Sequence, residues 1–293
     1  MPETPESGAA CTACGGAGYV VDQVVGVSAR AHRCACQVTC PRCGGSGYVM
    51  VSTGPGRVAQ ACSCRHLDQR IATFNAAGIP AAVAKASFDT FRPWSQSQSK
   101  AKIACESFAH QVRGDRASRG VLLHGKPGCG KTHLLAASLR WLALEKGISC
   151  RYVEFMLLLS DIRAGFGSNR GHMEILGPLA SVPVLAIDEL GKERGTEWER
   201  SMLDELISRR YNAGLTTVFA TNYPRDPAPV PVPTGGKFHT ASKEFQRDAE
   251  LMSLEERVGQ RIYSRLNEMC DFVIVDGPDY RKDAEPGRGS FWR

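Results

Sequence analysis

The chain has 293 residues, of which 43% are hydrophobic, so it can form one or two domains with a sizeable core. No run of about 18 apolar residues occurs, and no transmembrane helix is expected. The formal net charge is +6, but residues 121–293 carry none of it, which excludes a general basic field for nucleic acid. The N-terminus, MPETPESGAA, lacks the basic and apolar regions of a secretory signal, so we expect a cytoplasmic protein.

A cysteine repeat occupies the first part of the chain. CTACGGAGY begins at Cys11 and CPRCGGSGY begins at Cys40, and each is followed by a C-x-C motif. Eight of the twelve cysteines precede residue 65, and cytoplasmic thiols stay reduced, so the repeat indicates metal rather than disulfides. The valine-rich stretches at 19–27 and 48–51 are expected as short strands of a ribbon.

The simplest pairing of these cysteines forms two closed, tetrahedral, structural zinc sites. The first site uses Cys11, Cys14, Cys34 and Cys36, and the second uses Cys40, Cys43, Cys62 and Cys64. Cross-pairing between the units stays open, as do free thiols or a redox motif. Large apolar side chains are few here, so zinc is expected to act as the core. Two bound Zn²⁺ and eight thiolates would bring residues 1–66 from +2 to about −2.

A phosphate-binding loop follows. VLLH at 121–124 reads as a buried strand, and GKPGCGKT at 125–132 matches G-x-x-x-x-G-K-[ST] ahead of a helix over 133–147. The residues expected to bind the nucleotide are Gly125, Pro127, Gly128, Cys129, Gly130, Lys131 and Thr132. Backbone N–H groups of the loop would cradle phosphate oxygens. Lys131 should reach the β- and γ-phosphates of ATP, and Thr132 should ligate Mg²⁺.

Further strands are expected at 148–155, 182–190 and 215–224. The segment VPVLAIDEL ends in Asp188 and Glu189, as a Walker B segment does. Asp188 is expected to hold Mg²⁺, and Glu189 to orient and activate the attacking water. Asn222 ends the next strand, where a polar side chain can position that water against the γ-phosphate.

Two helices, over 196–214 and 253–270, begin with capping boxes. The boxes are formed by Thr196 with Glu199 and by Ser253 with Glu256. Arg261 and Arg265 are four residues apart in the second helix and share a face. That face is either a solvated basic surface or an arginine finger for a neighbouring subunit. A last strand and Arg281 close the domain in FVIVDGPDYR, at 272–281.

Over residues 78–283 the chain resembles the AAA+ ATPases of the DnaC/DnaI helicase-loader and IstB group. The segments that carry this resemblance are GIPAAVAKASFDTF, GKPGCGKTHLLAA, VLAIDELG, RRYNAGLTTVFATNYP and SLEERVGQRIYSRLNEMCDFVIVDGPDYR. The resemblance implies an α/β fold with a parallel sheet flanked by helices, and ATP hydrolysis at subunit interfaces. The C-x-x-C-x-G-x-G units at 11–18 and 40–47 are similar to the zinc repeats of DnaJ-type co-chaperones, which implies a small zinc-ribbon-like domain.

The resemblance also implies roles for single residues. Asn222 would be sensor 1, Arg265 the finger with Arg261 acting beside it, and Arg281 a γ-phosphate-side arginine. The expected organisation is a double zinc domain at 1–66, a linker and lead-in at 67–100, the ATPase domain at 101–283 and a flexible tail at 284–293. A Pro-rich insertion is expected within 223–237.

The function that the resemblance implies is loading of a hexameric replicative DNA helicase onto single-stranded DNA. The cofactors would be ATP, Mg²⁺ and two Zn²⁺ per chain, the protein would self-associate, and the zinc domain would dock on the helicase. DNA contact is expected in DIRAGFGSNRGHM, at 161–173, unless this is only a solvated loop. The residues concerned are Arg163, Phe166, Asn169, Arg170 and His172.

Two other functions fit the same sequence. One is an IstB-like transposition helper that acts with a transposase on duplex DNA. The other is a zinc-ribbon adaptor in which ATP only controls assembly. Activity that survives Glu189→Gln would favour the adaptor.

Overall fold

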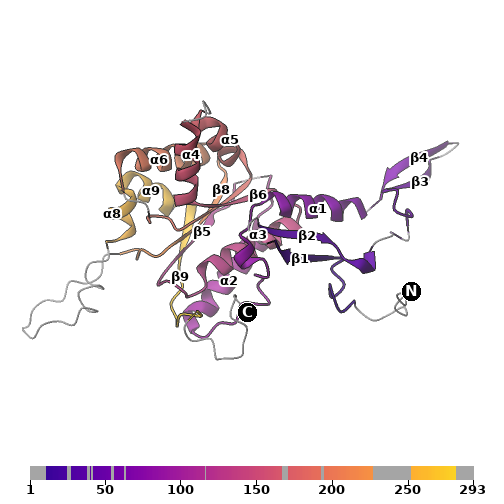
Figure 1. Cartoon of the computed structure of the whole chain (residues 1–293), viewed down its shortest axis with the longest axis horizontal. Helices are drawn as coiled ribbons and strands as arrows, with labels where there is room; N and C mark the ends of the chain where they lie inside the picture. The colour runs from indigo at the N-terminus through magenta and orange to yellow at the C-terminus, as the bar shows by residue number, and fades with distance from the viewer. Residues whose placement is uncertain are drawn as a thin grey trace, which may run out of the picture.

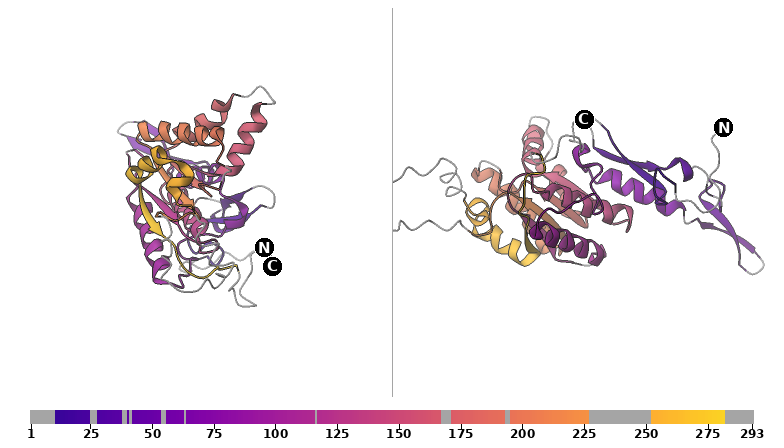
Figure 2. Two further views of the ribbon diagram at one scale, coloured as in Figure 1. Left: turned by 90° about the vertical axis from the view of Figure 1, so that its left-hand side faces the viewer. Right: turned by 90° about the horizontal axis from the view of Figure 1, so that it is seen from below.

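The computed structural model describes residues 11–24, 28–37, 40, 42–53, 56–62, 64–115, 117–166, 171–192, 195–226 and 252–281. Figure 1 shows a body built of a sheet and helices, from which the N-terminal hairpins extend to one side. The view from below in Figure 2 shows the same elongated arrangement. None of the helices in these ranges is both long and apolar enough to cross a bilayer.

Each cysteine repeat folds into an antiparallel hairpin. The first pairs β1 (Tyr19–Gln23) with β2 (Ala29–Arg33), and a short 3-10 helix, η1 (Ala35–Gln37), follows. The second pairs β3 (Tyr48–Thr53) with β4 (Gly56–Ala61). The sequence predicted the outgoing strand of each hairpin. The returning strands, ARAHR and GRVAQA, were missed because they contain few β-branched or aromatic residues.

The segment expected as a linker and lead-in, 67–100, contains a helix that packs on the body. Helix α1 (Cys64–Ala76) buries Leu67, Ile71 and Phe74 along one face, at helical spacing. This face joins the core that also holds Tyr19 of the first hairpin and residues of α3 (Lys131–Leu144). A 3-10 turn, η2 (Ala81–Val83), then leads to α2 (Gln96–Gln111). The first hairpin, α1 and the body therefore share one hydrophobic core.

A five-stranded parallel sheet forms the centre of the body, in the order β6-β7-β8-β5-β9. The strands are β5 (Gly120–His124), β6 (Cys150–Glu154), β7 (Val184–Asp188), β8 (Thr216–Thr221) and β9 (Cys270–Ile274). β5 and β8 are central and almost wholly buried; β5 contains the apolar run VLL, whereas β8 buries three threonines beside its apolar residues. The parallel arrangement brings the carboxyl ends of β7, β8 and β5 to one edge.

Alternate strand residues supply two separate cores. Leu123 faces the core beneath α1, α2 and α3, whereas Leu122 faces the core on the other side. That second core is covered by α4 (Phe155–Phe166), α5 (His172–Ser181), α6 (Glu197–Asn212), α8 (Leu254–Val258) and α9 (Gln260–Met269). The architecture is the predicted parallel sheet flanked by helices.

The capping boxes are confirmed, but the single helix expected over 253–270 is wrong. Thr196 and Ser253 each accept a backbone N–H from the glutamate three residues on. The second helix breaks at Gly259, whose φ of +88° is outside the right-handed helical region. The break separates α8 from α9 and turns α9, which carries Arg261 and Arg265, into its own direction.

Candidate nucleotide site and metal centres

The phosphate-binding loop has the expected strand–loop–helix geometry. β5 ends at His124 and α3 begins at Lys131, so residues 125–130 form the connection at the carboxyl edge of the sheet. Gly130 is the N-cap of α3 with φ +99°, a conformation that other residues seldom adopt. Pro127 lies exposed in the turn. The first N–H groups of α3 have no partner within the helix, so they can bind phosphate oxygens.

Lys131 lies inside this loop. Its Nζ donates to the carbonyl oxygens of Gly125 and Lys126, at 2.7 Å each, and the residue is only 7% exposed. Burial lowers the pKa of the ammonium group. Cys129 is buried and its thiol donates to Lys126 O at 2.8 Å, so it supports the loop conformation. Phosphate oxygens would be stronger acceptors for Nζ than these carbonyls.

Asp188 connects the loop to the Walker B strand. Its Oδ2 accepts from Thr132 Oγ1 at 2.7 Å and from the Tyr152 hydroxyl at 2.8 Å, while its Oδ1 accepts from Glu189 N at 2.8 Å. Burial and the adjacent carboxylate raise the pKa of Tyr152. A hydroxyl and a carboxylate in contact are the oxygen donors that Mg²⁺ takes in phosphate-binding sites. The residues present therefore fit that ion.

Glu189 leaves the strand in an unusual conformation and sits among charges. Its φ is +56°, and it is the single non-glycine residue with positive φ among the described residues. Lys192 Nζ lies 2.6 Å from Glu189 Oε2. Burial alone would raise the pKa of Glu189, but hydrogen bonding with Glu154 and the contact with Lys192 hold it below its usual value. The Glu189 side chain is thus kept ionised.

Glu154 is a site residue that sequence reasoning missed. It ends β6 and lies opposite Asp188 in the strand register, so it reaches the same edge of the sheet. Burial, followed by the hydrogen bond with Glu189, raises the pKa of Glu154 to about 7. An acid at the end of the predicted strand 148–155 was the signal that could have identified it.

Asn222 and Arg281 approach the site from two other segments. Asn222 follows β8, which lies between the Walker B strand β7 and the loop strand β5, and its side chain is exposed. Arg281 is also exposed, and its positive charge lowers the pKa of both Lys131 and Glu189. The structure therefore gathers the loop, the acidic pair, Asn222 and Arg281 around one edge.

The segment before Arg281 lies against the loop, which was not expected. Tyr280 N donates to Gly128 O at 3.1 Å, and a side chain at Gly128 would meet the Asp279 carboxylate. Tyr280 also packs against Phe91 and Trp94 of the lead-in, with ring centroids 6.0 and 4.5 Å away. These aromatic contacts hold the lead-in and the C-terminal segment beside the loop.

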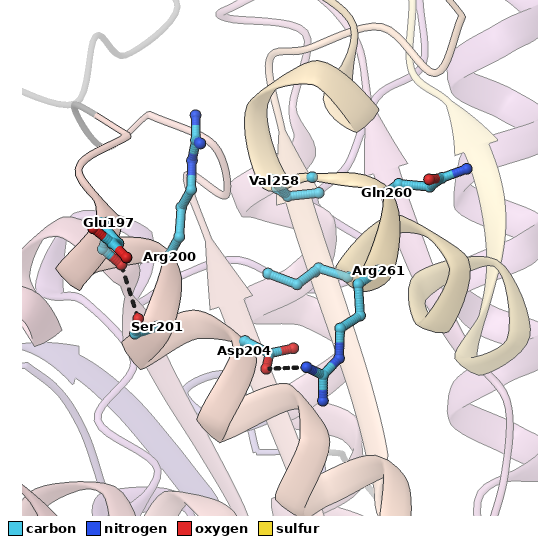
Figure 3. A pocket seen from close by; sticks show the side chains of 9 residues that line it. Glu197, Arg200, Ser201, Asp204, Val258, Gln260 and Arg261 are labelled. Carbon is cyan, nitrogen blue, oxygen red and sulfur yellow. Dashed lines mark hydrogen bonds and ion pairs between the residues drawn. The ribbon is translucent and has the colours of Figure 1, made fainter.

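The two arginines of α9 lie on a different surface. Arg265 Nη1 donates to Asp204 Oδ1 at 2.8 Å and its side chain is 19% exposed, whereas Arg261 lies 3.7 Å from Asp204 Oδ2 and is 72% exposed. Figure 3 shows Arg261 beside Asp204 in a groove of about 560 Å³ between α6 and the α8–α9 junction. The sharing of Asp204 confirms that both arginines are on one face, and Arg261 is the more accessible.

The eight N-terminal cysteines form two groups that match the simplest pairing. The sulfur atoms of each group lie within 4.8 Å of one another, and no other metal-type cluster occurs in the described residues. Cys11–Cys34 and Cys40–Cys62 sulfur pairs are 3.7 Å apart, and Cys14–Cys36 and Cys43–Cys64 pairs are 3.5 Å apart. Zn–S bonds of about 2.3 Å in a tetrahedron require sulfur separations of about 3.8 Å. A backbone hydrogen bond from Gly18 lowers the pKa of Cys14 to about 7, which favours the thiolate.

The segment considered for DNA contact is only partly described. Residues 161–166 belong to α4 rather than to a loop, and Asn169 and Arg170 lie outside the described residues. Arg163 pairs with the buried Glu199 at 2.7 Å and stacks on Trp198, so its guanidinium supports the start of α6. His172 lies 3.3 Å from Glu205.

Comparison with known proteins agrees with this geometry. The family model described as IstB-like ATP binding protein matches residues 58–226. The replicative helicase loader DnaC of Buchnera aphidicola subsp. Baizongia pistaciae is 30% identical over 147 residues, or 50% of this chain and 58% of that protein. DnaC of Escherichia coli strain K12 is 29% identical over 151 residues, covering 51% and 60%. The chain thus spans less than two thirds of the length of these relatives.

A solved structure supports the same relationship. The crystal structure of the DnaC helicase loader superposes with a TM-score of 0.53 at 26% identity, covering 66% of this chain and 98% of that one.

Proposed function

Because the chain belongs to the family of IstB-like ATP-binding proteins and has the AAA+ fold, we propose that it hydrolyses ATP to load a replicative DNA helicase onto single-stranded DNA. The observation that carries the ATPase part is the contact of Thr132 with Asp188 beside Glu189. The similarity to proteins named replicative helicase loader supports the choice of partner.

The chemistry follows from the side chains at the sheet edge. Thr132 and Asp188 would hold Mg²⁺, whose charge offsets that of the phosphate oxygens. Lys131 would exchange its two carbonyl acceptors for the β- and γ-phosphates. Glu189, kept ionised beside Lys192, would accept a proton from the attacking water. Asn222 would orient that water from the neighbouring strand.

Hydrolysis is proposed to require a second subunit. Arg261 and Arg265 pair with Asp204 on α6, on a surface separate from the phosphate-binding loop of their own chain. In an assembly, this surface would face the nucleotide of the neighbour, where a guanidinium stabilises the charge of the transferred phosphoryl group. Asp204 would then release the arginine that acts as the finger.

A transposition helper is the second candidate, since the matching family model is named for IstB. It would use the same ATPase chemistry with a transposase and duplex DNA. Partner choice therefore separates the two candidates, whereas nucleotide chemistry does not.

Native mass spectrometry of the full chain with its host's hexameric replicative helicase tests the proposal, with and without ATP. A defined ATP-dependent complex, together with ATP hydrolysis that Glu189→Gln abolishes, would support a loader. No complex under any nucleotide condition, from protein that retains two zinc ions, would reject the helicase and favour the transposition helper. Hydrolysis that persists in Glu189→Gln would reject the assigned base.

A further inference from the structure

The two zinc hairpins have the same sequence pattern but very different surroundings. Tyr19 and Tyr48 occupy equivalent positions in the repeat, yet Tyr19 is 8% exposed and Tyr48 is 49% exposed. Ala31 on β2 is buried, whereas Ala59 in the equivalent place on β4 is exposed. A difference of this kind between two copies of one fold indicates different tasks.

The first hairpin is part of the ATPase body. The Tyr19 hydroxyl donates to Glu145 of the α3 C-cap at 2.7 Å, and Ala29 N donates to Ile79 O at 2.8 Å. Asn75 of α1 bonds both the N–H and the carbonyl of Ala31, at 2.7 and 2.9 Å. These contacts join the first hairpin to α1 and the body through buried residues of β1 and β2.

The second hairpin projects away from the body beyond the start of α1 (Figure 1). β4 is exposed along its whole length, and β3 and β4 form a sheet with no other strand. Tyr48, Met50, Val51 and Val58 are 49%, 62%, 36% and 50% exposed. Its fixed point is the second cysteine group, because Cys64 is the first residue of α1. A two-stranded hairpin is marginally stable alone, so apolar side chains held out in this way favour a partner.

The composition of this hairpin identifies the kind of partner. Residues 40–66 contain three arginines and no lysine, aspartate or glutamate. Tyrosine, methionine and arginine are enriched at the centre of protein interfaces, whereas lysine and acidic residues are depleted there. Arginine as the sole charge fits an apolar surface rimmed by carboxylates.

Single-stranded DNA fits the hairpin less well. Bases need free aromatic faces for stacking, and the one aromatic side chain of the hairpin, Tyr48, has the Arg65 guanidinium 4.6 Å above its ring centroid.

We propose that the β3–β4 hairpin is the docking element of the chain, and that it binds an apolar, acidic patch on a partner protein. This rests on the proposed function in taking that partner to be the replicative helicase. The first hairpin, by contrast, does not contact the partner and completes the ATPase fold. The docking surface covers both faces of the hairpin: Tyr48, Met50 and Arg57 lie on one face, and Val51 and Val58 lie on the other.

Binding of the full chain to the purified hexameric helicase, measured by biolayer interferometry, tests this inference. The double variant Met50→Glu/Val58→Glu should bind roughly 30-fold more weakly or worse, since it places a carboxylate on each of the two faces of the hairpin. Arg57→Glu should also weaken binding, and Arg57→Lys should retain it. The matched control is Val24→Glu on the first hairpin, where Val24 is 38% exposed. The native mass spectrum of every variant must show two bound zinc ions, so that a variant that fails to fold is detected.

Each outcome decides the inference. Loss of helicase binding in the double variant, with Val24→Glu unaffected, supports it. Unchanged affinity of the double variant overturns it and leaves the proposed function intact, as does a loss confined to single-stranded DNA binding. Absence of wild-type binding rejects the helicase instead. A photo-crosslinking amino acid at positions 50, 58 and 24 in the host then identifies the partner. That partner, once purified, must bind the double variant more weakly than the wild type. Equal affinity overturns the inference, and so does a crosslinking yield at positions 50 and 58 that is no higher than the yield at the control position 24.

Discussion

Removing the two four-cysteine groups one at a time should affect the body very differently. Cys11→Ser/Cys14→Ser dismantles the site beneath the first hairpin, and Cys40→Ser/Cys43→Ser dismantles the site beneath the second. The first hairpin bonds to the body beyond α1, at Glu145 and Ile79. We therefore expect the first variant to lower the melting temperature of the body and the second to leave it nearly unchanged.

The size of the effect follows from the contacts of the first hairpin. Tyr19, Ala29 and Ala31 make the four hydrogen bonds to α1 and the body described above, and the two of Ala31 go to Asn75 of α1. At about 1 kcal/mol net for each bond, their loss costs roughly 4 kcal/mol. For a domain of this size, each kcal/mol shifts the melting temperature by about 2–4 °C, so the body should melt about 8–16 °C lower.

Tryptophan fluorescence is a suitable assay because all four tryptophans lie outside the cysteine repeats. Trp141 lies on α3 and Trp198 on α6, so the signal reports the body and not the hairpins. Zinc release, followed with a chromogenic chelator, confirms which site is empty. Equal shifts for the two variants, or no shift for the first, would refute the view that one hairpin is built into the body.

Further outcomes are expected at the nucleotide site and at α9. Glu189→Gln should lower ATP turnover by about 100-fold or more while ATP binding, measured by calorimetry, persists. In the folded chain Glu154 keeps its proton up to about pH 7, whereas in the unfolded chain it releases the proton above its ordinary pKa of 4.5. The free energy of unfolding in urea should therefore fall between pH 4.5 and about 7. Glu154→Gln should flatten that slope, and an unchanged slope would contradict the assignment. Arg261→Ala should reduce turnover of the assembly at unchanged stability. Arg265→Ala should also destabilise the chain by about 1–3 kcal/mol, since Asp204 loses a partner; equal melting of the two variants would be evidence against this.

The sequence predicted the central strands of the body well because they are buried on both faces. Strands such as β5 and β7 are continuous apolar runs that end in the loop or in Asp188, so pattern and site coincide. The capping boxes at Thr196 and Ser253 were equally local and were found. The box formed by Ser95 and Gln98 at the start of α2 follows the same rule but was passed over.

Features that depend on tertiary contacts were not predictable in this way. Glu154 enters the site only because β6 lies next to β7, and sheet order is not a local property. The different burial of Tyr19 and Tyr48 cannot be read from two nearly identical repeats, because it is decided by where α1 and Asn75 lie. The break at Gly259 was hidden by apolar spacing that continues across it.

The duplication of the cysteine module has an evolutionary consequence. Substitutions in β1 and β2 disturb Asn75, Ile79 and Glu145, so that copy is constrained by the stability of the whole chain. Substitutions in β3 and β4 meet mainly solvent, and the copy is anchored through its metal ligands. One copy is therefore free to diversify while the other is held fixed. A chain built in this way can acquire a new binding specificity through substitutions in β3 and β4, while the fold of the body stays the same.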